Sequence, residues 1–97
     1  MSNAKIGFCE IELYLPGVSS LKEKRGIIKS MLAKMRNQFN VANAEVGKQD
    51  TWQSATIAVT TVSNSTVHLE QTIQKVMKWI ENRYPDAMII KHSTEIL

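Results

Sequence analysis

Lysine and arginine are concentrated in one segment of the chain, from Ser20 to Asn40. Six basic residues lie there against Glu23 alone, so the segment carries a net charge of +5 and the remainder of the chain −2. At helical spacing, four of the six form one stripe beside an apolar face: Lys22, Arg25, Lys29 and Arg36. Such a stripe could bind the phosphate backbone of a nucleic acid, or it could be a solvated helix face.

Lys24 differs from these residues, because its helical direction lies within the apolar arc, between Met31 and Met35. One interpretation is a lysine held by a nearby carboxylate, Asp50 or Glu45. The other adds Lys24 to the stripe as a cation that binds an anion, assisted by the free N–H groups of the helix start.

Polar and aromatic residues elsewhere could complete such an anion pocket. We expect an edge pocket that includes Ser20, Asp50, Trp52 and Gln53, with Lys24 and Arg25 beside them. The indole of Trp52 could stack on a base or another planar group, or it could cover the end of the core.

Groups that support catalysis are sparse in this chain. Cys9 falls in a predicted core row, and His68 and His92 have no metal-ligating residues at a suitable spacing. Glu10 and Glu12 project from one face of a predicted strand and are expected to be solvated or paired with Lys91. We therefore predict no catalytic residues, no metal, no cofactor and no enzyme activity.

The hydrophobic pattern predicts the elements that position these residues. Period-two alternation indicates strands over residues 5–15, 40–47, 52–63 and 87–96, and period-3.6 apolar stripes indicate helices over 21–38 and from about 66 to 84. The first helix starts with a capping box, in which Ser20 accepts from the Glu23 N–H and the Glu23 carboxylate reaches the Ser20 N–H.

The order strand, helix, strand, strand, helix, strand predicts a ferredoxin-like α+β fold. Both helices then cover one face of an antiparallel four-stranded sheet, with the first and third strands in its middle. This topology brings residues 16–25, 47–53 and 84–86 to one rim of the sheet. The other sheet face offers Glu10 and Glu12 where RNA-recognition motifs place aromatic residues, so it is not expected to stack bases.

Composition is that of an ordinary globular domain. With 97 residues, 43% hydrophobic and 22% charged, the chain has room for one hydrophobic core, which we assign to residues 5–97. Residues 1–4 are interpreted as a tag remnant or a disordered start. No apolar run could span a bilayer and no secretory signal is recognisable, so we expect a cytoplasmic protein with no membrane partner.

Two stretches of the chain resemble the YlxP-like family of small bacterial proteins of unknown function: residues 11–17 followed by 20–25, and residues 39–53 with a match at 62–64. Gly26 departs from the pattern, since a bulkier or charged residue is usual there. The resemblance implies a ferredoxin-like homodimer with no catalytic residues to transfer. It also implies genes that neighbour those of translation factors, which favours RNA or the ribosome as a partner.

Three hypotheses remain open at this point. The first is a non-catalytic module that binds structured RNA or the ribosome through the basic stripe. The second is a dimeric module that binds a small anionic ligand at the rim, and the third is a purely structural domain. The homodimer is expected to form through the helix-free sheet face, where Phe8, Tyr14, Ala58 and Val62 lie among polar residues.

Overall fold

Two long strands with alternating apolar residues form the middle of the sheet. In the computed structural model, which describes residues 3–97, β1 (Lys5–Tyr14) and β3 (Ser54–Ser63) are antiparallel, with Cys9 opposite Val59. The edge strands are β2 (Ala42–Gly47), which pairs with β3, and β4 (Met88–Ile96), which pairs with β1. The strand order is β2-β3-β1-β4. Part of the predicted tag remnant, residues 1–2, lies outside the described residues.

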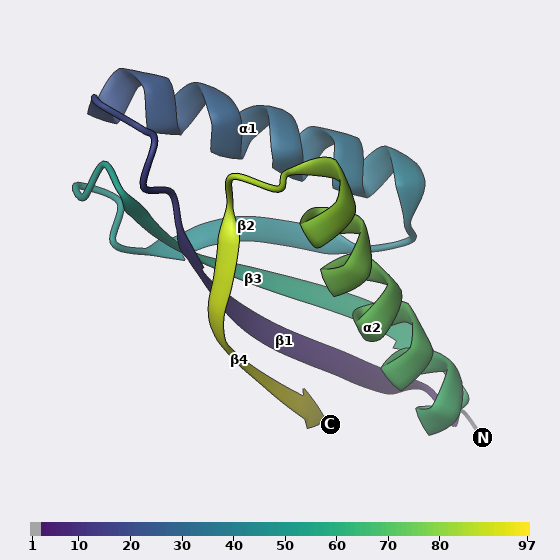
Figure 1. Ribbon diagram of the computed structural model, residues 1–97. Coiled ribbons are helices and arrows are strands. Elements are labelled where there is room, and N and C mark those ends of the chain that lie inside the picture. Colours follow the sequence, from purple (N-terminus) through teal and green to yellow (C-terminus); the bar gives the residue numbers. More distant parts are fainter. Residues whose placement is uncertain (1–2) are drawn as a thin grey trace.

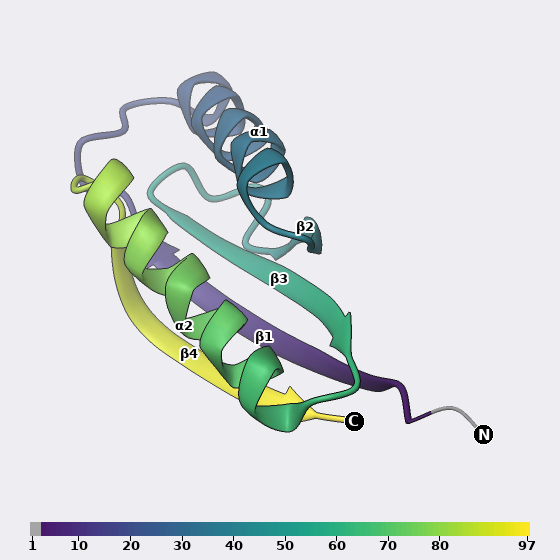
Figure 2. The same cartoon turned by 90° about the vertical axis from the view of Figure 1, so that its right-hand side faces the viewer.

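Two helices cover one face of this sheet, as Figures 1 and 2 show from two directions. Both α1 (Leu21–Gln38) and α2 (Thr66–Arg83) begin after a serine whose hydroxyl accepts a backbone N–H, Ser20 and Ser65 respectively. Such caps satisfy one of the N–H groups left free in the first turn of a helix. The predicted ferredoxin-like order, sheet type and helix placement are confirmed.

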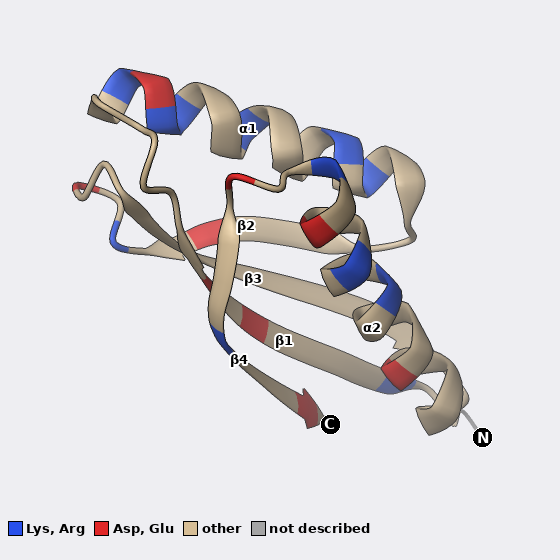
Figure 3. Cartoon of the chain, in the orientation of Figure 1, with Lys and Arg blue, Asp and Glu red and all other residues tan. Residues whose placement is uncertain are grey.

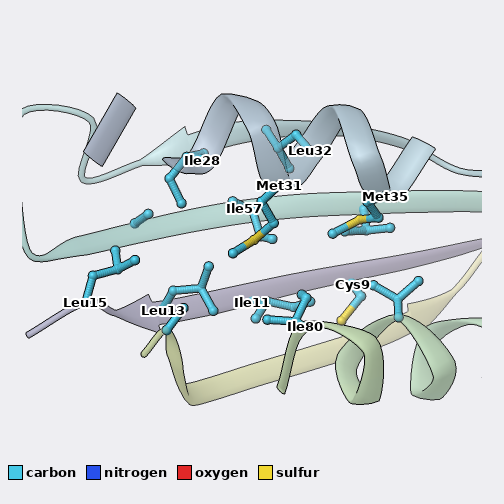
Figure 4. Close-up of a cluster of buried hydrophobic side chains, with 14 of the residues drawn as sticks. Cys9, Ile11, Leu13, Leu15, Ile28, Met31, Leu32, Met35, Ile57 and Ile80 are labelled. Carbon is cyan, nitrogen blue, oxygen red and sulfur yellow. The ribbon is translucent and has the colours of Figure 1, made fainter. Parts of the chain in front are cut away.

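The hydrophobic core lies between the helices and the sheet (Figure 4). From β1 it takes alternate residues such as Ile11 and Leu13, and from β3 it takes Ile57 and Val59. Helix α1 adds Ile28, Met31, Leu32 and Met35, and α2 adds Leu69, Ile73, Val76 and Ile80. These side chains match the apolar stripes expected from the sequence, and their burial orients both helices on the sheet.

The opposite sheet face is covered by no element among the described residues (Figure 1). Its central rows hold Glu10 and Glu12, with Lys91 opposite Glu12 on β4. Exposed apolar residues lie around them on the same chain segments: Ile6, Tyr14, Val46, Val62, Met88 and Ile90. The face therefore holds charged residues of both signs at its centre and apolar residues toward its ends.

Strand β2 places its polar side chains toward the helices and its apolar side chains on the open face of the sheet. Its half-buried residues are Asn43, Glu45 and Gly47, whereas Ala44 and Val46 are exposed. Asn43 Nδ2 donates to the Leu32 carbonyl of α1 at 3.0 Å, which satisfies one polar side chain on this inner side. The strand therefore presents hydrogen-bonding groups, rather than apolar ones, to the helix layer.

Candidate functional site

Lys24 is the largest fully buried side chain of the structure, with a relative exposure of 0%. Its ammonium donates to Glu45 Oε2 at 2.9 Å and to the carbonyl oxygens of Lys48, Gln49 and Ser54 at 2.8, 3.3 and 3.1 Å. An ammonium group has three N–H donors, and four oxygens surround this one. Lys24 therefore bonds α1 to β2 and to the turn between β2 and β3.

The interpretation of Lys24 as a cation held by Glu45 is confirmed, and its assignment to an anion-binding set is wrong. The ammonium is enclosed and already surrounded by oxygen acceptors, so an external anion has no donor left to contact. Burial of an unpaired charge is costly, and Glu45 together with the three carbonyl groups removes that cost here.

The start of α1 differs from the predicted capping box in one detail. Ser20 Oγ accepts from the Glu23 N–H at 3.1 Å, as expected. The Glu23 carboxylate, however, accepts from the N–H and hydroxyl of Ser19 at 3.3 and 3.1 Å, one residue earlier than predicted. Ser20 is thus a capping residue, and its hydroxyl contributes to the helix end rather than to a pocket.

Helix α1 presents three faces about 120° apart, given 100° per residue. One contains Lys24 and the buried apolar residues. The second contains the basic stripe, Lys22, Arg25, Lys29 and Arg36, which are all exposed. The third contains Gly26, Ile27 and Ser30, which line a cleft. Basic segments along α1 are visible in Figure 3.

The basic stripe lies on the side of α1 that borders the edge strand β2. Arg36 Nη1 donates to Asn43 Oδ1 on β2 at 2.6 Å, which fixes this side of the helix. Among the residues that the structure describes, the only salt bridges are Lys24–Glu45 and Lys48–Glu12. No carboxylate therefore neutralises the four cations of the stripe, and most of their donors face solvent.

The three segments expected at one rim do converge. Gln53 Nε2 donates to the carbonyls of Pro16 and Val18, and the Leu15 N–H donates to the Gln53 carbonyl at 2.9 Å. The link between α2 and β4 lies beside the same loop, since residues 15–18 and 83–87 line a common cleft. The topology thus predicted this gathering correctly.

The hollow at this rim differs from the expected edge pocket. The cleft has a volume of about 530 Å³ and lies between α1, the β1–α1 loop and the α2–β4 link. None of Ser20, Lys24, Arg25, Asp50, Trp52 and Gln53 lines it. Arg83 and Tyr84 do. Tyr84 belongs to the segment predicted at this rim, 84–86, whereas no signal in the sequence indicated Arg83. This cleft is therefore not the expected edge pocket, which stays a prediction for the residues other than Lys24.

Trp52 and Asp50 project from the turn between β2 and β3. Trp52 is 52% exposed, and the ring pairs found in the described part of the chain join Phe39, Trp79 and Tyr84 without it. Asp50 is also exposed. The interpretation of Trp52 as a cover for the core end is not supported by this exposure, because an indole that packs there loses most of its contact with water.

Cys9 is a buried thiol of the central strand. Burial raises its pKa, a hydrogen bond from Thr94 Oγ1 to Sγ opposes this shift, and the Glu10 charge adds to it. Because the pKa is raised, the thiol stays protonated at neutral pH and is a poor nucleophile. Its geometry is that of a small core residue, as the sequence indicated.

On the open sheet face, Glu12 forms a salt bridge with Lys48, and Glu10 lies opposite Ala58 and Ser93. His92 is exposed on β4 and His68 on α2. Within residues 3–97, no three histidine, cysteine or acidic side chains come close enough to hold a metal ion. Neither helix of this part of the chain is long and apolar enough to cross a membrane.

Comparison with known proteins gives a family without a described activity. The model of a family described as "Protein of unknown function (DUF503)" matches residues 6–94. The Bacillus subtilis (strain 168) "Uncharacterized protein YlxP" is 42% identical over 77 residues, which cover 79% of this chain and 84% of that protein. The resemblance noted from residues 11–25 and 39–53 is thereby confirmed.

Solved structures with a similar backbone are distant in sequence. The designed protein Foldit4 has a TM-score of 0.51 at 10% identity, with 97% of this chain and 96% of that chain covered. SnoaB, a cofactor-independent oxygenase from Streptomyces nogalater, has a TM-score of 0.49 at 8% identity, with 96% and 90% covered. At such identity the likeness to Foldit4 shows the fold alone.

Proposed function

The chain belongs to the family described as protein of unknown function (DUF503), and we propose that it is a non-catalytic module that binds structured RNA. The observation that supports this proposal is the exposed, unneutralised row of Lys22, Arg25, Lys29 and Arg36 on one flank of α1. The proposed place of action is the cytoplasm, with ribosomal RNA among the candidate partners.

The length and spacing of the stripe suit a nucleic-acid backbone. From residue 22 to residue 36, α1 rises about 21 Å at 1.5 Å per residue. Duplex nucleic acid presents phosphates along its whole length, and neutralising them releases counterions. The stripe holds lysine and arginine heads on a straight helix, so several phosphates of one groove edge can be contacted without deformation of the protein.

The open sheet face is less suited than α1 to bind RNA. Glu10 and Glu12 occupy its central rows, and β3 contributes Thr56, Ala58 and Thr60 there. The carboxylates repel a phosphate backbone, and the aromatic residues of this face, Phe8 and Tyr14, lie on β1 alone, so β3 adds no stacking surface. Charge therefore directs RNA to the helix side of the molecule, where Figure 3 shows the basic segments of α1.

Salt dependence tests the proposal directly. Binding of a labelled RNA duplex is measured by fluorescence anisotropy between 50 and 200 mM salt, with a DNA duplex of equal length for comparison. With about four phosphates neutralised, the slope of log K against log salt is expected near −3 to −4, so affinity falls roughly 100-fold over this range. A flat salt response, or no binding of RNA at 50 mM salt, contradicts the proposal.

A matched pair of triple variants separates the stripe from overall charge. Lys22→Glu, Arg25→Glu and Lys29→Glu together should abolish RNA binding. The control reverses three exposed lysines elsewhere, Lys34, Lys75 and Lys78, with the same change in net charge. Lys34 lies about 150° from the middle of the stripe on α1. Equal losses in the two triple variants would show non-specific attraction rather than a site.

A second candidate function is the binding of a small anionic ligand in the rim cleft, where Arg83 is the cation of the lining and Glu23 and Asp86 are its carboxylates. The cleft of about 530 Å³ combines apolar residues such as Leu15 and Ile27 with the exposed guanidinium of Arg83. A ligand at 100 times its Kd adds about 2.7 kcal/mol of stability. Thermal-shift measurements with nucleotides and phosphorylated metabolites test it. An Arg83→Gln variant should lose any shift that depends on this cleft.

The homodimer proposal places a second copy on the open sheet face. This face carries both signs of charge, so Glu10 of one copy can meet Lys91 of the other while the exposed apolar residues pack together. Val62→Lys on the face should give a monomeric mass by light scattering. Val67→Lys on α2 is the control, because the two valines are 58% and 62% exposed. A monomeric mass for the unmodified chain refutes this proposal.

A further inference from the structure

We propose that the RNA recognised by this protein is a duplex with an unpaired end, and that Trp52 stacks on the unpaired base. This inference rests on the proposed binding of RNA through the basic stripe and names the class of RNA more narrowly. It starts from an exposed indole in the turn that Lys24 bonds to the first part of α1.

Trp52 lies in a turn that is attached to α1 at the start of the stripe. The Lys24 ammonium donates to the carbonyls of Lys48, Gln49 and Ser54, on both sides of Trp52 in the chain. Arg25 follows Lys24 directly and is exposed. The indole and the first cations of the stripe are therefore held at the same end of the molecule.

The turn is fixed by further bonds, so the position of Trp52 is defined. The Thr51 N–H donates to the Lys48 carbonyl at 3.1 Å, and Gln53 bonds to the loop before α1 through its side chain and its carbonyl. A large aromatic side chain left 52% exposed on such a turn adds little to the hydrophobic core. Exposed aromatic residues are typical of binding surfaces.

The two parts of this surface suit different parts of an RNA. None of the exposed residues in the stripe itself is aromatic, so the stripe offers contacts to phosphates and no platform for bases. On the turn that carries Trp52, Lys48 is paired with Glu12, and the exposed Asp50 carboxylate repels phosphates. A duplex backbone therefore follows α1 and ends near the turn, where an unpaired base can reach the indole.

Lys24 is the positioning residue of this arrangement. It contacts no RNA, because it is fully buried, but its four bonds fix the distance between the turn and α1. The turn that carries the indole is thus fixed to the helix that carries the stripe before RNA binds, so less conformational entropy is lost on association.

The test compares a blunt RNA duplex with the same duplex carrying two unpaired nucleotides at either the 3′ or the 5′ end. For the unmodified chain, we expect one of these overhangs to bind roughly 5- to 150-fold more tightly than the blunt duplex, the range measured for stacking of one base on an aromatic side chain. The Trp52→Ala variant should lose this preference and keep its affinity for the blunt duplex.

Two further variants make the result specific. Trp52→Phe retains an aromatic face and should retain most of the preference, whereas Tyr14→Ala removes an exposed aromatic residue of the sheet face and should change nothing. Equal binding of all duplexes, or an equal loss for blunt and overhanging duplexes in Trp52→Ala, overturns this inference alone. Absence of salt-dependent binding to any duplex overturns the proposed function as well.

Discussion

Lys24 and Lys29, five positions apart on α1, show how one residue type serves two regions of the molecule. Their side chains diverge by about 140° around the helix. Lys24 is directed to the core face and is fully buried against Glu45 and three carbonyls, whereas Lys29 lies in the exposed stripe. Direction on the helix, rather than the presence of a charge, decides whether the cation holds the fold together or faces a partner.

The comparison also separates two kinds of electrostatic energy. A buried ion pair is worth little relative to an apolar pair, but removal of one partner leaves a charge and its acceptors without compensation. An exposed cation is solvated in the free protein and contributes to long-range attraction of an anionic partner. Substitutions in the first region should therefore change stability, and substitutions in the second should change binding.

The largest expected effect is that of Lys24→Met, which keeps the apolar stem and removes the ammonium. The Glu45 carboxylate and the carbonyls of Lys48, Gln49 and Ser54 lose their donor, so we expect a loss of about 3–5 kcal/mol in the free energy of unfolding. Urea denaturation measures it.

The matched control is Lys29→Met in the stripe, which should change stability by no more than about 0.5 kcal/mol. Adding Glu45→Gln to Lys24→Met removes the uncompensated carboxylate and should recover part of the loss. Similar losses for Lys24→Met and Lys29→Met would break the distinction between the two regions.

The next effect concerns the helix end from which both regions start. Ser20→Ala removes the oxygen that accepts from the Glu23 N–H and should cost about 1 kcal/mol of stability. Ser19→Ala removes one exposed bond to Glu23 and should cost less. Because Ser20 is a cap and does not line the cleft, RNA affinity measured well below the unfolding temperature should be unchanged. A large loss of affinity would indicate that Ser20 belongs to the binding surface.

Much of this arrangement follows from the sequence. Alternation in residues 5–15 and 54–63 identified the central strands, and the helical direction of Lys24 within an apolar arc indicated a buried cation. The rim at which residues 16–18, 53 and 84–86 gather follows from strand order alone. These features depend on hydrophobic periodicity, which the local sequence shows, and on the order of the elements along the chain.

Other features depend on register and turn geometry. The choice of Glu45 over Asp50 as the partner of Lys24 depends on which side of β2 faces α1. The hydrophobic alternation of β2 predicts the wrong inner side, because its alanine and valine side chains face the open side of the sheet and its polar side chains face α1. The cleft depends on how the β1–α1 and α2–β4 loops close, through bonds such as Val18 N–H to the Leu15 carbonyl.

A smaller effect, of opposite sign, is expected on the third face of α1. A Cβ atom at Gly26 would meet nothing within 4 Å, so Gly26→Ala can be accommodated without any shift. Glycine in a helix interior costs roughly 0.5–1 kcal/mol relative to alanine, and the variant should be more stable by about that amount. Urea denaturation measures the gain. A loss of stability would show that the cleft face needs the glycine backbone for a reason beyond space.

The smallest expected effect comes from the second salt bridge, between Lys48 and Glu12. The Lys48 side chain is 45% exposed and that of Glu12 21%, compared with 0% and 16% for Lys24 and Glu45. Water solvates both partners when the pair is broken, so Lys48→Met should cost at most about 1 kcal/mol, and less at high salt. Urea denaturation at two salt concentrations measures both quantities. A salt-independent loss as large as that of Lys24→Met would mean that exposure does not separate the two pairs, and that the turn between β2 and β3 is held from the sheet face as firmly as from α1.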